Sequence, residues 1–582
     1  MFDDQCVEPD ATCLRRGVPY SETPVRARGC FILCSLGWLL AGGCLLYSAI
    51  FQAPASDEFG HFYAGLRYWQ LGDLETFNVN PPLLRSICTF PAYLTGMGQE
   101  AADDSLRRDR MSRPEFSNGR KLFCTAPARF QYWLSMGRLF VVATTMAGGM
   151  LLFRWGKQLA GDTAGWLAAG MWFAQPQILS HGVLITGDVY CAVWMMVAIR
   201  VLVWTTEHLS AKRAIALGAT VGMAVLAKFT ALVLLPILLY AFAWQADRYR
   251  LHRLIGCLLI VGITLVLVVS LPYGFAGWGK DLRDYEFLSK SMSDPQSKYQ
   301  FWRESLPWLR FPVPLPEQLV LGIDRQQLDF ERGLPSYAAG LRAPHGWWWF
   351  YLYSMLVKLP SGTWIAIAAT IYLLVAKRNA ISRGLALPLA LFAGMLAVTA
   401  AQDGFAQQHR YVLPAYPPLF LVIGVVAARG LQLDGRAGKR AGRVVQIGFA
   451  ASLIASCWVA PHWLSSFNWP AGGSRSGYKC LFNDASDWGQ DTYRVRDWIV
   501  QHQGGIPIYV RSSYSGHAQL AAVGAEFREF PNDWNDLERG CWIVVSKSNL
   551  VIDNRMARFL SSIPIHGQIA DSHLVYFVGV DP

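Results

Sequence analysis

Apolar runs long enough to cross a membrane recur along most of this chain and constrain its fold more than any other feature. A membrane-spanning helix needs roughly 17 to 25 mainly apolar residues, because its backbone polar groups must be satisfied within the segment. Only 16% of the residues are charged, against about a quarter in a soluble domain. We therefore predict a multi-pass α-helical membrane protein with about eleven spans, at 30–52, 134–153, 163–180, 187–205, 214–227, 229–245, 254–272, 361–376, 384–401, 411–428 and 444–461.

The net charge of +11 lies mainly in alternate short loops between these spans. Arg154 and Lys157 occupy one such loop, and Lys212 and Arg213 occupy the next loop on the same side. Because Lys and Arg in short loops stay in the cytoplasm, the pattern predicts a cytoplasmic N-terminus and an external C-terminus. The basic excess is thus interpreted as a topology signal, and no nucleic-acid partner is expected.

This orientation places three sizeable segments outside, at about 53–133, about 273–360 and from about 462 onward. Phe59, Phe62, Tyr63, Leu66 and Trp69 recur at helical spacing, which predicts a helix lying on the membrane surface. A second surface helix is expected over Leu83 to Leu94.

The tail has short β-rich runs, Pro507 to Val510, Cys541 to Val545 and Leu574 to Val578, which are predicted to be strands separated by helical segments at about 491–503 and 554–562. We expect a membrane domain over 1–461 and a small extracytoplasmic α/β domain over 462–582.

The cysteines show no metal-type spacing. Cys88 and Cys124 share the first external segment, and Cys480 and Cys541 share the tail. Either pair could form a disulfide in an oxidising compartment, and the sequence leaves this open. There is also no phosphate-cradling glycine-rich loop or nucleotide-binding motif.

An acidic pair, Asp57 and Glu58, lies just past the outer end of the first predicted span. Carboxylates at a membrane are costly unless they have partners or a function. Asp57 and His61 are four residues apart and share a helix face, so a general base that positions a hydroxyl is one interpretation. A helix N-cap formed by Ser56 or Asp57 is the other.

Further polar residues are expected on the same membrane face. Asp188 begins the fourth predicted span, where it acts either as a helix cap or as part of an external active site. Each basic residue there could simply extend toward lipid headgroups, but several together favour an anionic ligand such as a lipid phosphate. This set comprises Arg85, Arg138, Lys228, Lys358 and Arg410.

The order of these motifs resembles the membrane glycosyltransferases of the GT-C class. The resemblance is to the branch of protein O-mannosyltransferases and lipid A aminoarabinose transferases (glycosyltransferase family 39 and relatives). The similar segments are Asp57-Glu58 with His61, Asn80-Pro81-Pro82-Leu83, Gly137-Arg138-Leu139, Asp188, Gly222 to Lys228, Trp347 to Pro360, His409 to Pro414, Phe467 to Gly473 and Asp487 to Asp491.

The resemblance implies inverting transfer of a hexose or pentose from a polyprenyl-phosphate carrier to an acceptor hydroxyl on the outer face. The acceptor is a glycan, lipid or protein, and the enzyme lies in the bacterial inner (plasma) membrane among its lipids. Asp57, Glu58 and Asp188 are the expected catalytic residues, with Asp57 as general base and Glu58 placing the acceptor. The expected substrate-binding residues are His61, Tyr63, Arg85, Arg138, Lys228, Lys358, Arg410 and Tyr411.

The physical logic of this assignment is that a phosphate leaving group needs cations rather than protonation, while a carboxylate deprotonates the incoming hydroxyl. Metal dependence varies within the GT-C class. With no clear third carboxylate ligand, we expect no metal ligands among the site residues and no required cofactor, although a divalent metal stays open. Asp487 and Trp488 in the tail are open between sugar binding and a structural role.

Two rival functions remain at this point. A transporter or flippase of lipid-linked sugars would also handle this substrate, but transporters tend to show inverted repeats and helices broken at mid-bilayer. The second rival is a scaffold without catalytic activity, whose external tail binds a partner. Loss of Asp57 with retained function would favour the scaffold.

Overall fold

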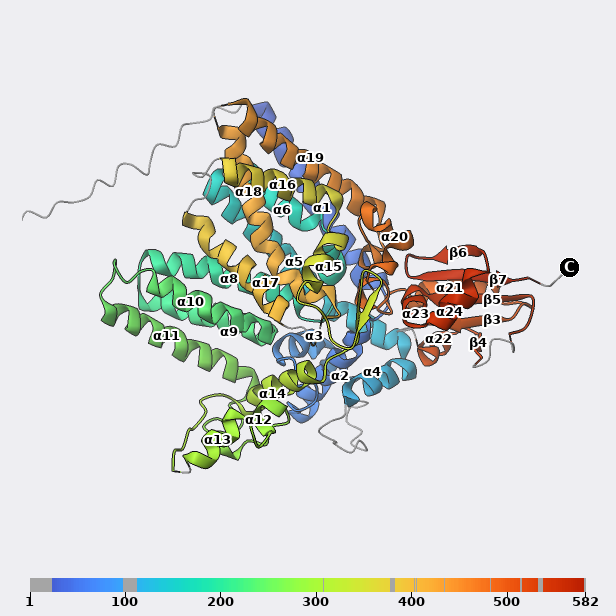
Figure 1. The fold of residues 1–582 in the computed structure, drawn as a ribbon, viewed down its shortest axis with the longest axis horizontal. Coiled ribbons are helices and arrows are strands. Elements are labelled where there is room, and N and C mark those ends of the chain that lie inside the picture. Colours follow the sequence, from blue (N-terminus) through green and yellow to red (C-terminus); the bar gives the residue numbers. More distant parts are fainter. Residues whose placement is uncertain are drawn as a thin grey trace, which may run out of the picture.

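The computed structural model describes residues 24–97, 113–306, 308–376, 383–401, 404, 406–433, 435–481, 483–512, 516–531 and 537–579. A large helical body makes up most of the molecule, and a small sheet domain lies at one end of it, coloured red in Figure 1. The fold class predicted from the sequence is confirmed in these two parts.

The helical body holds long apolar helices and several shorter ones around a continuous apolar core. Its helices are α1 (Pro24–Phe51), α2 (Ser56–Leu71), α3 (Leu83–Leu94), α4 (Pro114–Thr125), α5 (Pro127–Ala160), α6 (Asp162–Phe173), α7 (Pro176–His181), α8 (Asp188–Glu207), α9 (Ala211–Ala227), α10 (Leu234–Ala243), α11 (Leu251–Ser270), α12 (Lys290–Ser293), α13 (Lys298–Ser305), α14 (Glu317–Arg332), α15 (Phe350–Lys358), α16 (Ser361–Ala376), α17 (Ala386–Ala401), the 3₁₀ segment η9 (His409–Ala415), α18 (Tyr416–Gln432) and α19 (Arg436–Trp458).

The number of spans differs from the predicted eleven, although each predicted range falls on helical segments. By length and composition, five of the described helices can cross a membrane, or up to seven if each bent pair counts as one span. The bent pairs are Leu36–Phe51 with Ser56–Leu71, at 77°, and Phe350–Lys358 with Ser361–Ala376, at 114°. The physical reason is length: helices such as α6, with 12 residues, and α10, with 10, are shorter than a bilayer requires.

The helix predicted after the acidic pair is α2, but it does not lie on a surface. Phe59, Phe62 and Leu66 are buried, because α3, α4 and α5 surround the helix. Two glycines permit this close approach: a Cβ at Gly65 would lie 2.6 Å from the Arg85 carbonyl oxygen in α3, and one at Gly119 of α4 would clash with the Phe59 carbonyl. The helix itself was predicted, but its aromatic residues pack inside the protein rather than in a membrane interface, whereas the second predicted helix matches α3 residue for residue.

Helices α12, α13 and α14 lie beyond one end of α11, and α14 lies beside α2 and α3 (Figure 1). A two-stranded antiparallel hairpin, β1 (Ser336–Ala338) and β2 (Leu341–Ala343), follows α14. This region covers the end of the helical body where α2 begins.

The sheet domain has five strands in the order β4 (Arg528–Glu529), β3 (Ile508–Arg511), β5 (Cys541–Ser546), β7 (His573–Val578) and β6 (Ile565–Ile569). Strand β3 runs parallel to β4 and β5, whereas β7 runs antiparallel to β5 and β6. The structure contains the three strands predicted near 508, 541 and 574 and both predicted helices. Strands β4 and β6 were not predicted. The elements are α20 (Gly473–Ser476), α21 (Thr492–His502), β3 (Ile508–Arg511), α22 (His517–Ala522), β4 (Arg528–Glu529), β5 (Cys541–Ser546), α23 (Lys547–Ile552), α24 (Asn554–Ser561), β6 (Ile565–Ile569) and β7 (His573–Val578).

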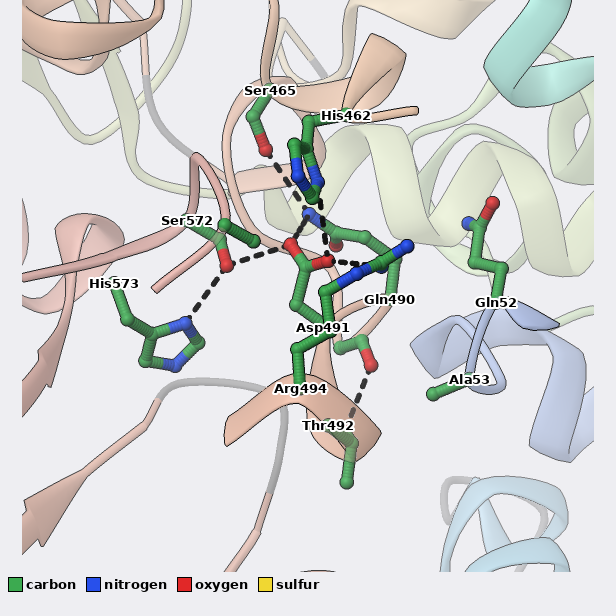
Figure 2. A network of polar contacts seen from close by, with 12 residues as sticks. Gln52, Ala53, His462, Ser465, Gln490, Asp491, Thr492, Arg494, Ser572 and His573 are labelled. Atoms are coloured by element: carbon green, nitrogen blue, oxygen red, sulfur yellow. Dashed lines mark hydrogen bonds and ion pairs between the residues drawn. The ribbon is translucent and has the colours of Figure 1, made fainter. Parts of the chain in front are cut away.

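A buried carboxylate, Asp491, fixes the sheet domain to the segment that follows α19 (Figure 2). It accepts hydrogen bonds from Arg494 Nη1 at 2.7 Å, Ser572 Oγ at 2.7 Å and Gln490 Nε2 at 3.1 Å, and His462 Nδ1 lies 3.8 Å away. Burial opposes ionisation of Asp491, but the nearby His462 ring and the Arg494 charge lower its pKa to about 2. Asp491 thereby connects the segment around His462 with the loop of the sheet domain that contains Ser572, and this fixes the residues just before Asp491.

Candidate functional site

A polar cavity of about 220 Å³ lies at the N-terminal end of α2. Its walls come from α2, the loop after it, the turn between α9 and α10, helix α14 and the segment η9. The lining residues are Asp57, His61, Phe77, Val79, Asn80, Arg113, Phe116, Thr186, Lys228, Thr230, Gln326, Asp329, Phe330, Gln408, Arg410 and Tyr411.

Asp57 is in the first turn of α2, and its side chain is 22% exposed. Arg410 Nη2 donates a hydrogen bond of 2.8 Å to Asp57 Oδ2. His61, one turn further along, lines the same cavity, and its ring lies 4.5 Å from that of Phe77. The side chains predicted to share a helix face therefore meet one cavity, in contact with a cation.

Asp188 and Lys228 form a buried ion pair behind this wall. Asp188 begins α8 directly after Gly187, which has a φ of +82° and would place a Cβ 3.0 Å from the Ala227 carbonyl oxygen. Only glycine fits this turn without strain, and the turn brings Asp188 against the end of α9, where Lys228 follows. Lys228 Nζ also lies 4.2 Å from the centre of the Tyr411 ring, within cation–π range.

Arg410 lies among three carboxylates. Besides Asp57, its Nε is 3.9 Å from Asp188 Oδ2 and 3.8 Å from Asp484 Oδ2. Its guanidinium carbon lies 4.2 Å from the centre of the Trp488 ring. One buried cation is thus shared by residues from α2, α8 and the segment before α21.

Glu58 does not line the cavity, and its side chain is fully buried. It pairs with Arg138 of α5 and accepts hydrogen bonds from Ala55 N at 2.9 Å and Ile185 N at 3.1 Å. Arg138 also donates to the carbonyl oxygens of Ala49, in the last turn of α1, and of Gln52 and Ala53, which follow it. These contacts join the end of α1 and the start of α2 to α5. Glu58 and Arg138 therefore support the packing of these three helices.

Three further residues from the predicted binding set also lie outside the cavity lining. Arg85 donates to the carbonyl oxygens of residues 76, 77 and 80 and so holds the loop that forms one wall. Lys358 donates to the carbonyl oxygens of Leu464, at 2.9 Å, and Ala485, at 2.6 Å. The hydroxyl of Tyr63 accepts a hydrogen bond of 3.4 Å from Asn118.

Asp484 and Trp488 adjoin the site; the sequence did not point to Asp484, and it left Trp488 open between sugar binding and a structural role. Both are buried, and Asp484 has a pKa raised to about 7 by burial, against the opposing charges of Arg410 and Lys358. The segment Asp487 to Asp491 was singled out by resemblance, which was the available signal. Asp487 itself accepts a hydrogen bond from Ser546 Oγ and lies away from the cavity lining.

Within the described ranges, no group of three His, Cys, Asp or Glu side chains is arranged to hold a metal ion. The described cysteines, which include Cys88, Cys124, Cys480 and Cys541, are free thiols, so neither proposed disulfide is formed. The fixed positive charge at the cavity wall comes from Lys228, Arg410 and Arg113, which pairs with Asp329 at 3.0 Å.

A family model for dolichyl-phosphate-mannose-protein mannosyltransferase matches residues 134–273. A search of the curated proteins gives no match. Similar solved structures include ArnT from Cupriavidus metallidurans bound to undecaprenyl phosphate, with 11% identity and a TM-score of 0.47 over 96% of this chain and 100% of that one. The oligosaccharyltransferase from Archaeoglobus fulgidus is also similar, with 11% identity and a TM-score of 0.46 over 84% of this chain and 63% of that one.

The family-model match covers α5 to α11, including Arg138, Asp188 and Lys228. It agrees with the membrane helices of the structure and with the motif order read from the sequence. Over residues 134–273, this match agrees with the resemblance to the protein mannosyltransferase branch.

Proposed function

We propose that this protein transfers a sugar from a polyprenyl-phosphate carrier to an acceptor hydroxyl at the extracytoplasmic membrane face, with inversion. The observation that carries the proposal is that one cavity is lined by the carboxylate of Asp57 and by the cations of Lys228 and Arg410. These are the groups needed to deprotonate a hydroxyl and to stabilise a departing phosphate.

In the proposed reaction, Asp57 accepts the acceptor's proton while the acceptor oxygen bonds to the anomeric carbon. The bond from that carbon to the phosphate oxygen breaks, and its electron pair leaves with the polyprenyl phosphate. Lys228 and Arg410 stabilise the charge that develops on the phosphate. Thr186 and Asn80 also line the cavity and can donate hydrogen bonds to sugar hydroxyls.

Arg410 has a second function in this proposal, because it holds Asp57 at 2.8 Å before the donor arrives. When a donor phosphate draws the guanidinium toward itself, the Asp57 carboxylate is released from this hydrogen bond and can accept the proton of the acceptor. Activation of the base would thus depend on occupancy of the phosphate position.

An apolar groove of about 580 Å³ between α15, α16, α17 and α18 supports a lipid-linked donor. It is lined by aliphatic and aromatic side chains that include Leu352, Ile371, Leu396 and Leu419. Leu419 follows Arg410 by nine residues along continuous helical structure, a rise of roughly 15 Å. A phosphate at Arg410 could therefore extend its prenyl chain along this groove.

The experiment that tests the function is transfer from radiolabelled undecaprenyl-phosphate sugars to membrane acceptors by the wild type and Asp57→Asn. We expect label to enter a glycan, lipid or protein with the wild type, and Asp57→Asn to lose about 10²- to 10⁴-fold of that rate. The matched control, Asp162→Asn, changes an exposed carboxylate paired with Lys157 and should retain activity.

Near wild-type transfer by Asp57→Asn would remove the assignment of the base. If no donor supports transfer, and intact lipid-linked sugar crosses reconstituted vesicles, the protein is a transporter instead.

A further inference from the structure

The segment just before α21 reaches the N-terminal end of α2 and closes one side of the site. Ser56 N donates a hydrogen bond of 2.9 Å to the Trp488 carbonyl oxygen, and Ala53 N donates one of 3.2 Å to the Gln490 carbonyl oxygen. The Trp488 side chain is 1% exposed and packs against Arg410. A tail segment therefore contacts both the helix that holds Asp57 and the cation that binds it.

Asp484, four residues before Trp488, also lies close to Arg410, with its Oδ2 3.8 Å from Nε. Its carboxylate is fully buried, and neither oxygen accepts a hydrogen bond from any described residue. Arg410 Nε and Asp188 Oδ2 are likewise buried without a hydrogen bond in the described part of the chain. Because buried polar groups are nearly always paired, this arrangement indicates a guanidinium with alternative partners.

We propose that Asp484 and Trp488 are positioning residues that control how tightly Arg410 holds Asp57. Trp488 supports the guanidinium plane, and Asp484 is a competing carboxylate 3.8 Å from Nε, against 2.8 Å from Nη2 to Asp57. Attraction toward Asp484 weakens the contact with Asp57 and releases that carboxylate to accept a proton. The inference rests on the proposed function, in which Asp57 accepts the proton of the acceptor.

The charge of Asp484 determines the strength of this competition. The charged groups that face it are Arg410, Lys358, Asp188 and Asp57, with Lys228 behind Asp188. Lys358 Nζ donates to two backbone carbonyl oxygens, one of them that of Ala485. Burial raises the Asp484 pKa to about 7, so this carboxyl changes charge near neutral pH.

Two consequences follow when Asp484 ionises. Arg410 is drawn from Asp57, so kcat should rise through about pH 7. The added negative charge also lies near the phosphate position, so undecaprenyl phosphate should bind more weakly above this pH. Asp484→Asn keeps the shape of the side chain and removes both changes.

The test uses the full-length protein in detergent or vesicles, with undecaprenyl phosphate as the binding probe and a transferred undecaprenyl-phosphate sugar as the substrate. In Asp484→Asn we expect a kcat about tenfold below wild type at pH 8, a wild-type value at pH 6, and no rise between them. Asp497→Asn, an exposed carboxylate on α21, is the matched control and should keep the wild-type profile.

Trp488→Leu should raise the KM for the donor several-fold, and Trp488→Phe, which retains a ring under Arg410, should largely restore it. A pH profile of kcat and of undecaprenyl phosphate affinity that is identical in wild type and Asp484→Asn would overturn the proposal. The affinity measurement needs no transfer. If no donor is turned over, the proposed function fails, while a pH-dependent affinity lost in Asp484→Asn would still support the link between Asp484 and Arg410.

Discussion

The buried pair of Glu58 and Arg138 allows the structural and chemical contributions of the acidic pair to be separated. Both side chains are fully buried, and Arg138 donates to Glu58 and to three backbone carbonyl oxygens at the end of α1. Replacing Arg138 with Met leaves Glu58 as a buried charge without its cation. Such a loss typically costs about 3–5 kcal/mol, and the unpaired carbonyls add to it.

The buried thiols Cys88 and Cys191 provide the assay, because they are 1% and 0% exposed. In detergent, the labelling rate of these thiols by a thiol-reactive dye follows the population of the opened protein. A loss of about 3 kcal/mol should speed labelling by roughly a hundredfold. Arg154→Met is the control, since it changes an exposed arginine in the same helix, α5.

The double variant Glu58→Gln/Arg138→Met should recover part of the loss, because it no longer buries an unpaired charge. The reasoning is refuted if Arg138→Met labels at the wild-type rate yet no longer transfers sugar. That outcome would place the pair in the chemistry rather than in the support of α1 and α2.

Two other predictions concern the cavity and its charges. Lys228→Ala should raise the KM for the donor about tenfold or more with little change in the KM for the acceptor, and Lys212→Ala, at the start of the preceding helix α9, should change neither. Equal effects on donor and acceptor would contradict a phosphate-binding role for Lys228. Because the pKa of Asp484 is raised from an unfolded value near 4 to about 7 in the folded protein, its contribution to stability is complete below about pH 4 and is lost as pH rises through 7. Thermal unfolding from pH 4.5 to 8.5 should therefore show Asp484→Asn gaining up to about 4 kcal/mol over wild type toward pH 8, and equal slopes for the two proteins would rule this out.

The helices were predictable because their apolar runs are long and their polar breaks are sharp. Sequence periodicity could not reveal that α2 is covered on several sides, since that depends on α4, whose Gly119 meets the Phe59 backbone. A run with aromatics at helical spacing suits both a membrane surface and a buried helix.

The candidate site was predictable in part for a similar reason. Asp57, His61, Lys228, Arg410 and Tyr411 do line one cavity, as shared sidedness indicated. The predicted membrane side of a residue does not tell whether a cation lines the cavity or supports a loop. Arg85, for example, supports a loop. The contribution of Asp484 depends on contacts between residues more than seventy positions apart, and no local pattern encodes them.

The backbone contacts of residues 53 and 56 with residues 490 and 488 have a consequence for biosynthesis. The helix that holds Asp57 is made early in translation, but its first turn is completed only by a segment made more than 400 residues later. At about 5–20 residues per second, that interval lasts at least some twenty seconds. A ribosome-bound chain that ends before residue 484 would therefore lack these contacts, and newly made protein would acquire activity only after its C-terminal segment has docked on α2.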